Sequence, residues 1–197
     1  MAAIRSYGVG DFGAIYDICL KTGDAGRDAS ALYRDLRLIG HVYAGPYGAL
    51  EPESCFVVED EQGVAGYIVG ARDTYSFEKK TEREWWPELR ARYPEIGEGS
   101  RDARMIRLIH HPTRTPRAIN EPYPSHLHIN LLPRLQGKGW GKKLIDHWLD
   151  AMRGSDSSGA HLGVGLSNER AVRFYGAYGF KQIAREKDVL VLGISFS

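Results

Sequence analysis

The sequence predicts a mixed α/β fold, in which one sheet carries helices on both faces. The first observation is the order of segments: a strand, two helices, a hairpin, then strand and helix twice over, and a closing pair of strands. The second is the length of 197 residues with 43% hydrophobic side chains, which suffices for one sizeable core. We therefore expect residues 1–197 to form a single domain.

Charge and cysteine content narrow the class of protein. The chain has 26 basic and 25 acidic residues and a formal net charge of +1, which gives no general argument for binding nucleic acid or a membrane surface. Cys19 and Cys55 are too few for a disulfide framework and lack metal-ligand spacing. No signal-like segment and no run of 18 apolar residues is present. We expect a cytoplasmic protein without a metal.

The first half of the chain contains a strand, helices and a hairpin. Residues 3–7 are predicted as a short strand, residues 11–21 and 29–39 as helices, and residues 41–52 as a loop rich in Gly, Pro and Tyr. Two β-branched runs, 55–58 and 64–71, then flank Glu61-Gln62-Gly63. A short gap that holds a glycine is typical of a hairpin.

A long segment, residues 72–124, separates this hairpin from the next strand. Residues 77–93 are charged and include Trp85 and Trp86, and residues 105–109 are a second short helical candidate. An unstructured span of this length is uncommon in a compact domain. We therefore expect it to contain helices and to shape a pocket.

The second half alternates strands with helices. Leu127, Ile129 and Leu131 alternate with polar residues, which predicts a half-buried strand over 126–132. Apolar residues at helical spacing between 144 and 152 predict a helix to about residue 153. A strand at 160–166, a helix from Asn168 and closing strands at 181–185 and 188–196 complete the order.

The turn between strand 126–132 and its helix is suited to hold phosphate. Glycines at 137, 139 and 141 remove the Cβ atoms that would keep an anion from the backbone. The helix start supplies unpaired N–H groups and the positive end of its dipole. Lys138, Lys142 and Lys143 add positive charge.

Two common phosphate-loop patterns do not match this turn. A P-loop requires Ser or Thr after Lys142, and a dinucleotide fingerprint requires glycine at 142 or 144. The residues fit the pattern Gln/Arg-x-x-Gly-x-Gly/Ala instead, through Gln136, Gly139 and Gly141.

A second motif begins about thirty residues later. Its pattern is Asn-x-x-Ala-x-x-x-Tyr-x-x-x-Gly-Phe, formed by Asn168, Ala171, Tyr175, Gly179 and Phe180. A capped core helix would also explain these residues, with Asn168 as N-cap and Gly179 just past the end. The two motifs in this order and at this separation resemble the GCN5-related N-acetyltransferase (GNAT) superfamily. The resemblance implies a mostly antiparallel sheet with a splayed central strand pair.

A narrower resemblance concerns residues 72–124 together with the stretches 108–112 and 131–137. They look similar to bacterial relatives of the acetyltransferase-like C-terminal domain of eukaryotic protein O-GlcNAcase. Domains attached to those hydrolases are regarded as having lost the cofactor site. A non-catalytic module that binds CoA or a protein partner is therefore the alternative to an enzyme.

The resemblance implies acetyl-CoA as donor substrate and direct transfer of the acetyl group to a primary amine in a ternary complex. The backbone of Leu131 and Leu132 would bind the pantetheine arm, and Asn168 would bond the arm from the other side. Tyr175 would face the sulfur and protonate the departing thiolate, while an N–H near Leu132 would stabilise the oxyanion. The residues that would contact the pyrophosphate are Gln136, Gly137, Lys138, Gly139, Trp140, Gly141 and Lys142.

The catalytic base is less defined by the sequence. Deprotonating an alkylammonium of pKa near 10.4 costs about 4.6 kcal/mol at pH 7. The family often places an acidic residue on the strand before the loop, but here His126, His128 and Asn130 share that face. His128 is the candidate base, or else a hydrogen-bonded strand histidine, and Asn130 can orient the acceptor or a water. Other candidates, from the 72–124 segment, are Asp102, His110, His111 and Glu121.

Overall fold

Within residues 1–154 and 157–196, which the computed structural model describes, seven strands form one mixed sheet. Its spatial order is β1-β2-β3-β4-β5-β7-β6. The β4–β5 pair is parallel and the other neighbouring pairs are antiparallel. The strands are β1 (Ala3–Ser6), β2 (Phe56–Asp60), β3 (Gly63–Ala71), β4 (Ser125–Leu131), β5 (Gly159–Gly165), β6 (Lys181–Glu186) and β7 (Val189–Ser195).

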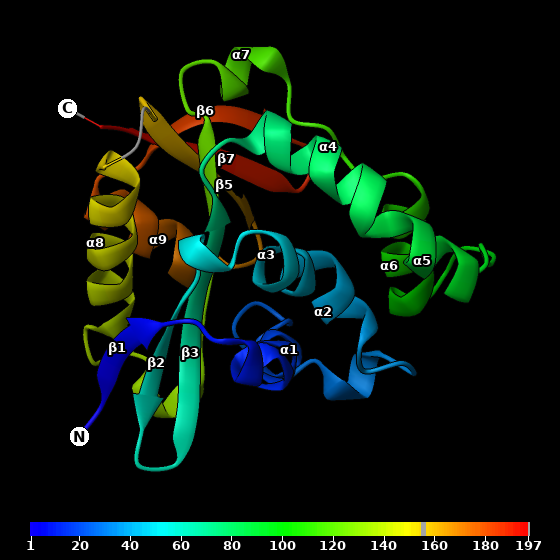
Figure 1. Ribbon diagram of the computed structural model, residues 1–197, viewed down its shortest axis with the longest axis horizontal. Coiled ribbons are helices and arrows are strands. Elements are labelled where there is room, and N and C mark those ends of the chain that lie inside the picture. The colour runs from blue at the N-terminus through cyan, green and yellow to red at the C-terminus, as the bar shows by residue number, and fades with distance from the viewer. Residues whose placement is uncertain (155–156, 197) are drawn as a thin grey trace.

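Helices cover both faces of this sheet, which confirms the predicted fold class. Figure 1 shows α8 and α9 against one face and α1 to α6 on the other. The helices are α1 (Phe12–Lys21), α2 (Leu38–Tyr43), α3 (Gly45–Leu50), α4 (Thr74–Glu84), α5 (Trp86–Arg92), α6 (Arg101–His110), α7 (Arg117–Asn120), α8 (Trp140–Arg153) and α9 (Glu169–Tyr178). No helix within the described ranges is both long and apolar enough to cross a membrane.

The amphipathic face of α8 packs into the core as its sequence predicts. Trp148 is fully buried, and its indole N–H donates to the carbonyl oxygen of Ser54 at 3.0 Å. A Cβ at Gly70 of β3 would stand only 2.6 Å from the Trp148 ring. Strand β3 therefore needs glycine there for the helix to lie this close to the sheet.

The helix predicted over residues 29–39 is wrong. The chain forms a 3₁₀ turn at Ser30–Leu32, and after the extended Tyr33 it bends and turns over residues 34–37 before α2 begins at Leu38. A side-chain carboxylate takes backbone N–H groups that a helix would use: Asp102 accepts from Arg34 at 3.0 Å and from Asp35 at 3.1 Å. Such bonds offer the backbone an alternative to the helical ladder.

The loop predicted over residues 41–52 is also wrong, because α2 and α3 occupy most of it. Pro46 lies in the first turn of α3, where its missing N–H is not needed. A Cβ at Gly40 or Gly45 would collide with the ring of Tyr16. These glycines therefore permit close packing within helices, whereas their presence in the sequence suggests a loop.

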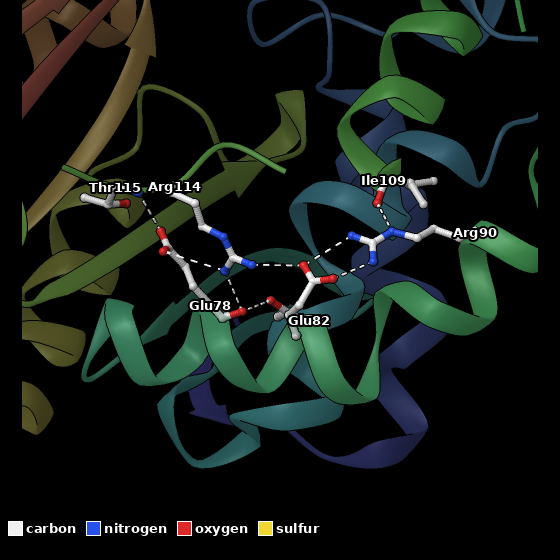
Figure 2. A network of polar contacts seen from close by, with 7 residues as sticks. Glu78, Glu82, Arg90, Ile109, Arg114 and Thr115 are labelled. Carbon is white, nitrogen blue, oxygen red and sulfur yellow. Dashed lines mark hydrogen bonds and ion pairs between the residues drawn. The ribbon is translucent and has the colours of Figure 1, made fainter. Parts of the chain in front are cut away.

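The long 72–124 segment is helical, as expected, and contains α4 to α7. The helix expected over 77–93 breaks at Trp85, two residues before Pro87, into α4 and α5. Figure 2 shows the contacts that join them to the rest of the segment. Arg90 of α5 binds the carboxylate of Glu82 of α4 and donates to the carbonyl oxygen of Ile109 at 3.0 Å.

Arg114 extends this network from the segment that follows α6. Its guanidinium donates to Glu82 at 2.9 Å and to the carbonyl oxygen of Glu78 at 2.8 Å. The Glu78 carboxylate accepts the backbone N–H of Thr115 at 2.8 Å. One patch of α4 thus fixes the positions of α5 and of the chain after α6.

Candidate functional site

A fork in the sheet opens between β4 and β5. The two strands pair only at Ser125–Ala160 and His126–His161, after which β5 continues against β7 while β4 stays with β3 as far as Leu131. From Leu127 onward, β4 has no strand neighbour on its β5 side within the described residues. This is the splayed strand pair that the resemblance to the GNAT superfamily implies.

The pairing of β4 with β3 shows which backbone N–H groups near Leu132 face the fork. The N–H of Leu132 itself donates to the carbonyl oxygen of Ala65 at 2.8 Å and therefore points toward β3. Backbone groups alternate along a strand. The N–H groups of Ile129 and Leu131 consequently point into the fork, and they are the candidate donors to the pantetheine arm and to the oxyanion.

The glycine-rich turn lies at the end of the fork and has the backbone geometry of an anion site. Gly137 and Gly139 have φ of +72° and +80°, and an added Cβ at either would meet nothing within 4 Å. Gly139 is the N-cap of α8, and the first intrahelical bond that closes on it comes from the N–H of Lys143 at 3.2 Å. The preceding N–H groups of Trp140, Gly141 and Lys142 have no helical acceptor.

Gln136 holds this turn against the neighbouring elements. Its Nε2 donates to the carbonyl oxygen of Leu131 at 2.7 Å and to that of Gly26 at 3.3 Å, and its Oε1 accepts from Arg170 of α9 at 2.6 Å. An added Cβ at Gly141 would lie 3.1 Å from the Phe174 ring of α9. The start of α8 is therefore positioned by both β4 and α9.

The cations of the turn are not equivalent. Lys142 is paired with Asp146 at 2.8 Å, and the Lys143 ammonium lies 4.3 Å from the centre of the Trp140 ring. Lys138 is exposed and forms no ion pair with any described residue. Arg170, which the sequence analysis did not select, contacts only the neutral Gln136 amide, so its charge is also uncompensated within the described part of the chain.

The Asn168 motif forms α9 and its two ends. Asn168 caps the helix by accepting the N–H of Ala171 at 3.1 Å, and Gly179 ends it with φ of +119°. The structural interpretation of these two residues is therefore confirmed. The capping contact leaves the Asn168 amide nitrogen without a partner among the described residues, and the predicted contact to the pantetheine arm stays a prediction.

Tyr175 presents a free hydroxyl on an otherwise buried side chain. Its ring packs against those of Phe174 and Phe180, with centroids 5.3 and 5.6 Å away. The hydroxyl forms no hydrogen bond within the described residues, yet it is not sealed from solvent. Burial raises the pKa of Tyr175, so the hydroxyl keeps its proton at neutral pH.

One face of β4 carries His126, His128 and Asn130 toward the helices α1 to α4. This is the candidate acceptor face of β4. Asn130 donates to the hydroxyl of Thr22, and both histidines contact the hydroxyl of Tyr47 through Nε2, at 2.8 and 3.1 Å. Burial lowers the pKa of His128 to about 4, so the side chain is neutral at pH 7. Tyr47 was not selected from the sequence, since it lies in the segment expected to be a loop.

The other candidate bases are engaged elsewhere. Asp102 accepts backbone N–H groups of residues 34 and 35, and Glu121 is paired with Arg117 at 2.7 Å. His110 contacts the carbonyl oxygen of Tyr93 at 2.7 Å, and His111 contacts Glu95 at 2.6 Å beside a surface hollow of about 560 Å³. The described contacts bring none of these four side chains to the acceptor face of β4.

Comparison with known proteins agrees with this architecture. Protein O-GlcNAcase of Rattus norvegicus is 28% identical over 200 residues, which cover 98% of this chain and 22% of that protein. This chain thus spans about a fifth of the length of that relative. The crystal structure of SsHAT is 38% identical, with a TM-score of 0.92 and 98% of both chains covered.

Two further comparisons bear on the fold and the family. A putative acetyltransferase from Salmonella typhimurium, solved with its cofactor acetyl-CoA, is 17% identical, with a TM-score of 0.56 and coverage of 98% of this chain and 93% of that chain. At that identity the likeness supports the fold alone. Residues 24–180 match the model of the acetyltransferase (GNAT) family. Because this match spans most of the chain, the protein belongs to the acetyltransferase (GNAT) family.

Proposed function

We propose that this protein transfers the acetyl group of acetyl-CoA directly to a primary amine in a ternary complex. Membership of the acetyltransferase family supports acetyl transfer. The observation that carries the proposal further is the fork, where backbone of β4 without a strand neighbour among the described residues lies between the glycine-rich turn and the face that carries His128. The free hydroxyl of Tyr175 adds a proton donor.

The residues of the fork fit a molecule with a phosphate end and a thioester end. The unpaired N–H groups at the start of α8 would bind the pyrophosphate, and the charges of Lys138 and Arg170 would add attraction. The Leu131 N–H, which is nearer to the turn, would bond the pantetheine arm as a strand neighbour does, and the Ile129 N–H would lie beside the thioester. The bound arm would thus replace the missing part of β5.

The reaction forms a C–N bond, breaks a C–S bond, removes one proton from the amine and adds one to the sulfur. In this proposal the Ile129 N–H stabilises the negative charge that develops on the carbonyl oxygen, a contribution of about 3–4 kcal/mol in comparable sites. Tyr175 donates its proton to the sulfur, and general acid help of this kind is worth roughly 10²- to 10⁴-fold.

His128 takes the proton that the amine loses. With a pKa of about 4, it cannot effectively deprotonate a free ammonium of pKa near 10.4. The acceptor therefore attacks as the neutral amine, and its proton becomes acidic enough to pass to His128 only as the C–N bond forms. At pH 7 this route costs about 4.6 kcal/mol for a lysine-like amine and about 1 kcal/mol for an α-amino group. We accordingly propose acceptors of low amine pKa.

Thiol release from acetyl-CoA across a panel of amino acids, peptides, amino sugars and polyamines tests the proposal. We expect release that depends on the acceptor and equals the amount of N-acetylated product, with the highest kcat/KM at pH 7 for low-pKa amines. Acetyl-CoA without an acceptor is the control. Tight binding of acetyl-CoA without turnover of any acceptor would contradict the proposal and favour a non-catalytic CoA-binding module.

A further inference from the structure

Four side chains form one continuous hydrogen-bonded chain on the acceptor face of β4. Thr74 Oγ1 lies 2.7 Å from Nδ1 of His126, and Nε2 of His126 lies 2.8 Å from the hydroxyl of Tyr47. The same Tyr47 hydroxyl lies 3.1 Å from Nε2 of His128. The chain runs from the start of α4 through β4 and α3 and back to β4.

The position of each proton follows from the carbonyl at the far end. Thr74 Oγ1 also lies 2.7 Å from the carbonyl oxygen of Pro124, which can only accept. The single hydroxyl proton of Thr74 must therefore lie between these two oxygens, since two oxygens without a proton between them would repel at this distance. Thr74 can then only accept from His126, which assigns the proton of His126 to Nδ1.

The remaining protons follow in sequence. Burial, with the neighbouring His161 and His128, lowers the pKa of His126 well below its ordinary value, so its ring is neutral and its Nε2 is an acceptor. Tyr47 keeps its proton because burial raises its pKa, and it donates that proton to His126. The Tyr47 oxygen then accepts from His128, which assigns the proton of His128 to Nε2.

We propose that Tyr47, held by His126 and Thr74, is a positioning residue that fixes His128 in the Nε2–H tautomer and leaves its Nδ1 lone pair as the proton acceptor of the reaction. The Nδ1 atom forms no hydrogen bond within the described residues and is not sealed from solvent. When Nδ1 takes a proton, every hydrogen bond of the chain keeps its donor and acceptor. The inference rests on the proposed acetyl transfer and names the residues that make its base ready.

The groups around His128 leave this assignment undisturbed. His161 on β5 contacts the carbonyl oxygen of Tyr123 at 2.7 Å and must donate through Nδ1. Glu78 on α4 is held by Thr115, and the ring of Tyr43 on α2 lies 5.7 Å from that of His128. The charged or titratable groups that act on the chain from the surrounding elements are His161, Tyr43, Glu78 and Cys55, while Arg104 and Cys19 act on Tyr43.

Nuclear magnetic resonance of the full chain with ¹⁵N-labelled histidine tests the tautomers without any catalysis. At pH 7 we expect His128 to show a protonated Nε2 and a bare Nδ1, and His126 to show the reverse. Spectra of H128Q and H126Q assign the signals. A bare Nε2 on His128, or a doubly protonated His126, would overturn the inference even if the protein transfers acetyl groups.

Tyr47→Phe tests the positioning role in catalysis. It removes the hydroxyl alone, so we expect His128 to become a mixture of tautomers and kcat to fall about tenfold, with KM for acetyl-CoA within about twofold. Tyr43→Phe is the matched control, because Tyr43 contacts His128 through its ring and no hydrogen bond of its hydroxyl to His128 exists among the described residues. Wild-type kcat in a folded Tyr47→Phe protein would refute the role.

The two proposals fail in different ways. Absence of turnover with every amine would overturn acetyl transfer, and the catalytic part of this inference with it, while the tautomers are still decided by the spectra. If Tyr47→Phe does not fold, Thr74→Val provides the second test. It removes the acceptor of the His126 Nδ1 proton, and an unchanged tautomer of His126 would contradict the assignment.

Discussion

Replacing Gly139 by Ala separates the stability of the turn from its proposed role in binding. Gly139 has φ of +80°, and an added Cβ there meets nothing within 4 Å. An L-residue in this conformation costs about 1–2 kcal/mol. Gly63, the first residue of β3, has φ of +96° and equally open surroundings. Gly63→Ala is therefore a matched control with the same backbone penalty away from the fork.

Only Gly139→Ala should weaken the binding of acetyl-CoA. A phosphate oxygen bonded to a backbone N–H approaches to about 2.9 Å of the nitrogen, whereas a methyl group keeps its neighbours about 3.5–4.0 Å away. We expect both variants to unfold about 2–8 °C below wild type. Acetyl-CoA at about 100 times its Kd should stabilise wild type and Gly63→Ala by about 2.7 kcal/mol.

For Gly139→Ala, a tenfold weaker Kd would reduce this stabilisation to about 1.4 kcal/mol at the same ligand concentration. Differential scanning fluorimetry with and without acetyl-CoA measures all three proteins, and titration calorimetry gives the Kd values. The same acetyl-CoA shift in Gly139→Ala and Gly63→Ala would refute the assignment of the turn as the pyrophosphate site.

Three further predictions follow from the site and its surroundings. Tyr175→Phe should lower kcat by about 10²-fold while leaving the Kd of acetyl-CoA within about twofold, and equal turnover in stopped-flow thiol assays would remove Tyr175 from the acid role. Arg170→Gln should weaken acetyl-CoA binding by about threefold to tenfold and flatten its salt dependence. Arg173→Gln removes a cation already paired with an acidic neighbour and should do neither. Identical calorimetric titrations of the two variants would contradict this. Burial lowers the pKa of His41 to about 4. As pH falls from 6.5 toward 4, the unfolded state therefore binds the proton before the folded state does. The free energy of unfolding should fall by about 2 kcal/mol at pH 5 because of this. The free energy of unfolding measured in urea should depend less steeply on pH in His41→Gln than in wild type. An unchanged slope would contradict the lowered pKa of His41.

The sequence predicted the elements whose pattern is local. The alternation before Leu131 and the helical spacing after it defined β4 and α8, and the glycines between them defined the turn. The Asn168 motif likewise predicted α9 and both of its ends. In these places one short segment contains all the information that its conformation requires.

Other parts of the site depend on contacts between distant residues. Tyr47, Thr74 and His126 meet only in the folded chain, so their shared hydrogen bonds leave no mark in any local pattern. The choice between Leu131 and Leu132 as the N–H in the fork depends on the pairing of β4 with β3. A change of one residue in that register would reverse it, and the local pattern of β4 does not show which residue of β3 lies opposite each of its own.

Hydrogen exchange at individual backbone amides tests the central claim, that acetyl-CoA binds in the fork between β4 and β5. In the free protein, the N–H groups of Ile129 and Leu131 should exchange faster than that of Leu132, which is bonded to Ala65. Adding acetyl-CoA should protect Ile129 and Leu131 together with the first N–H groups of α8. Protection confined to other elements, or none at these amides under saturating acetyl-CoA, would contradict the account.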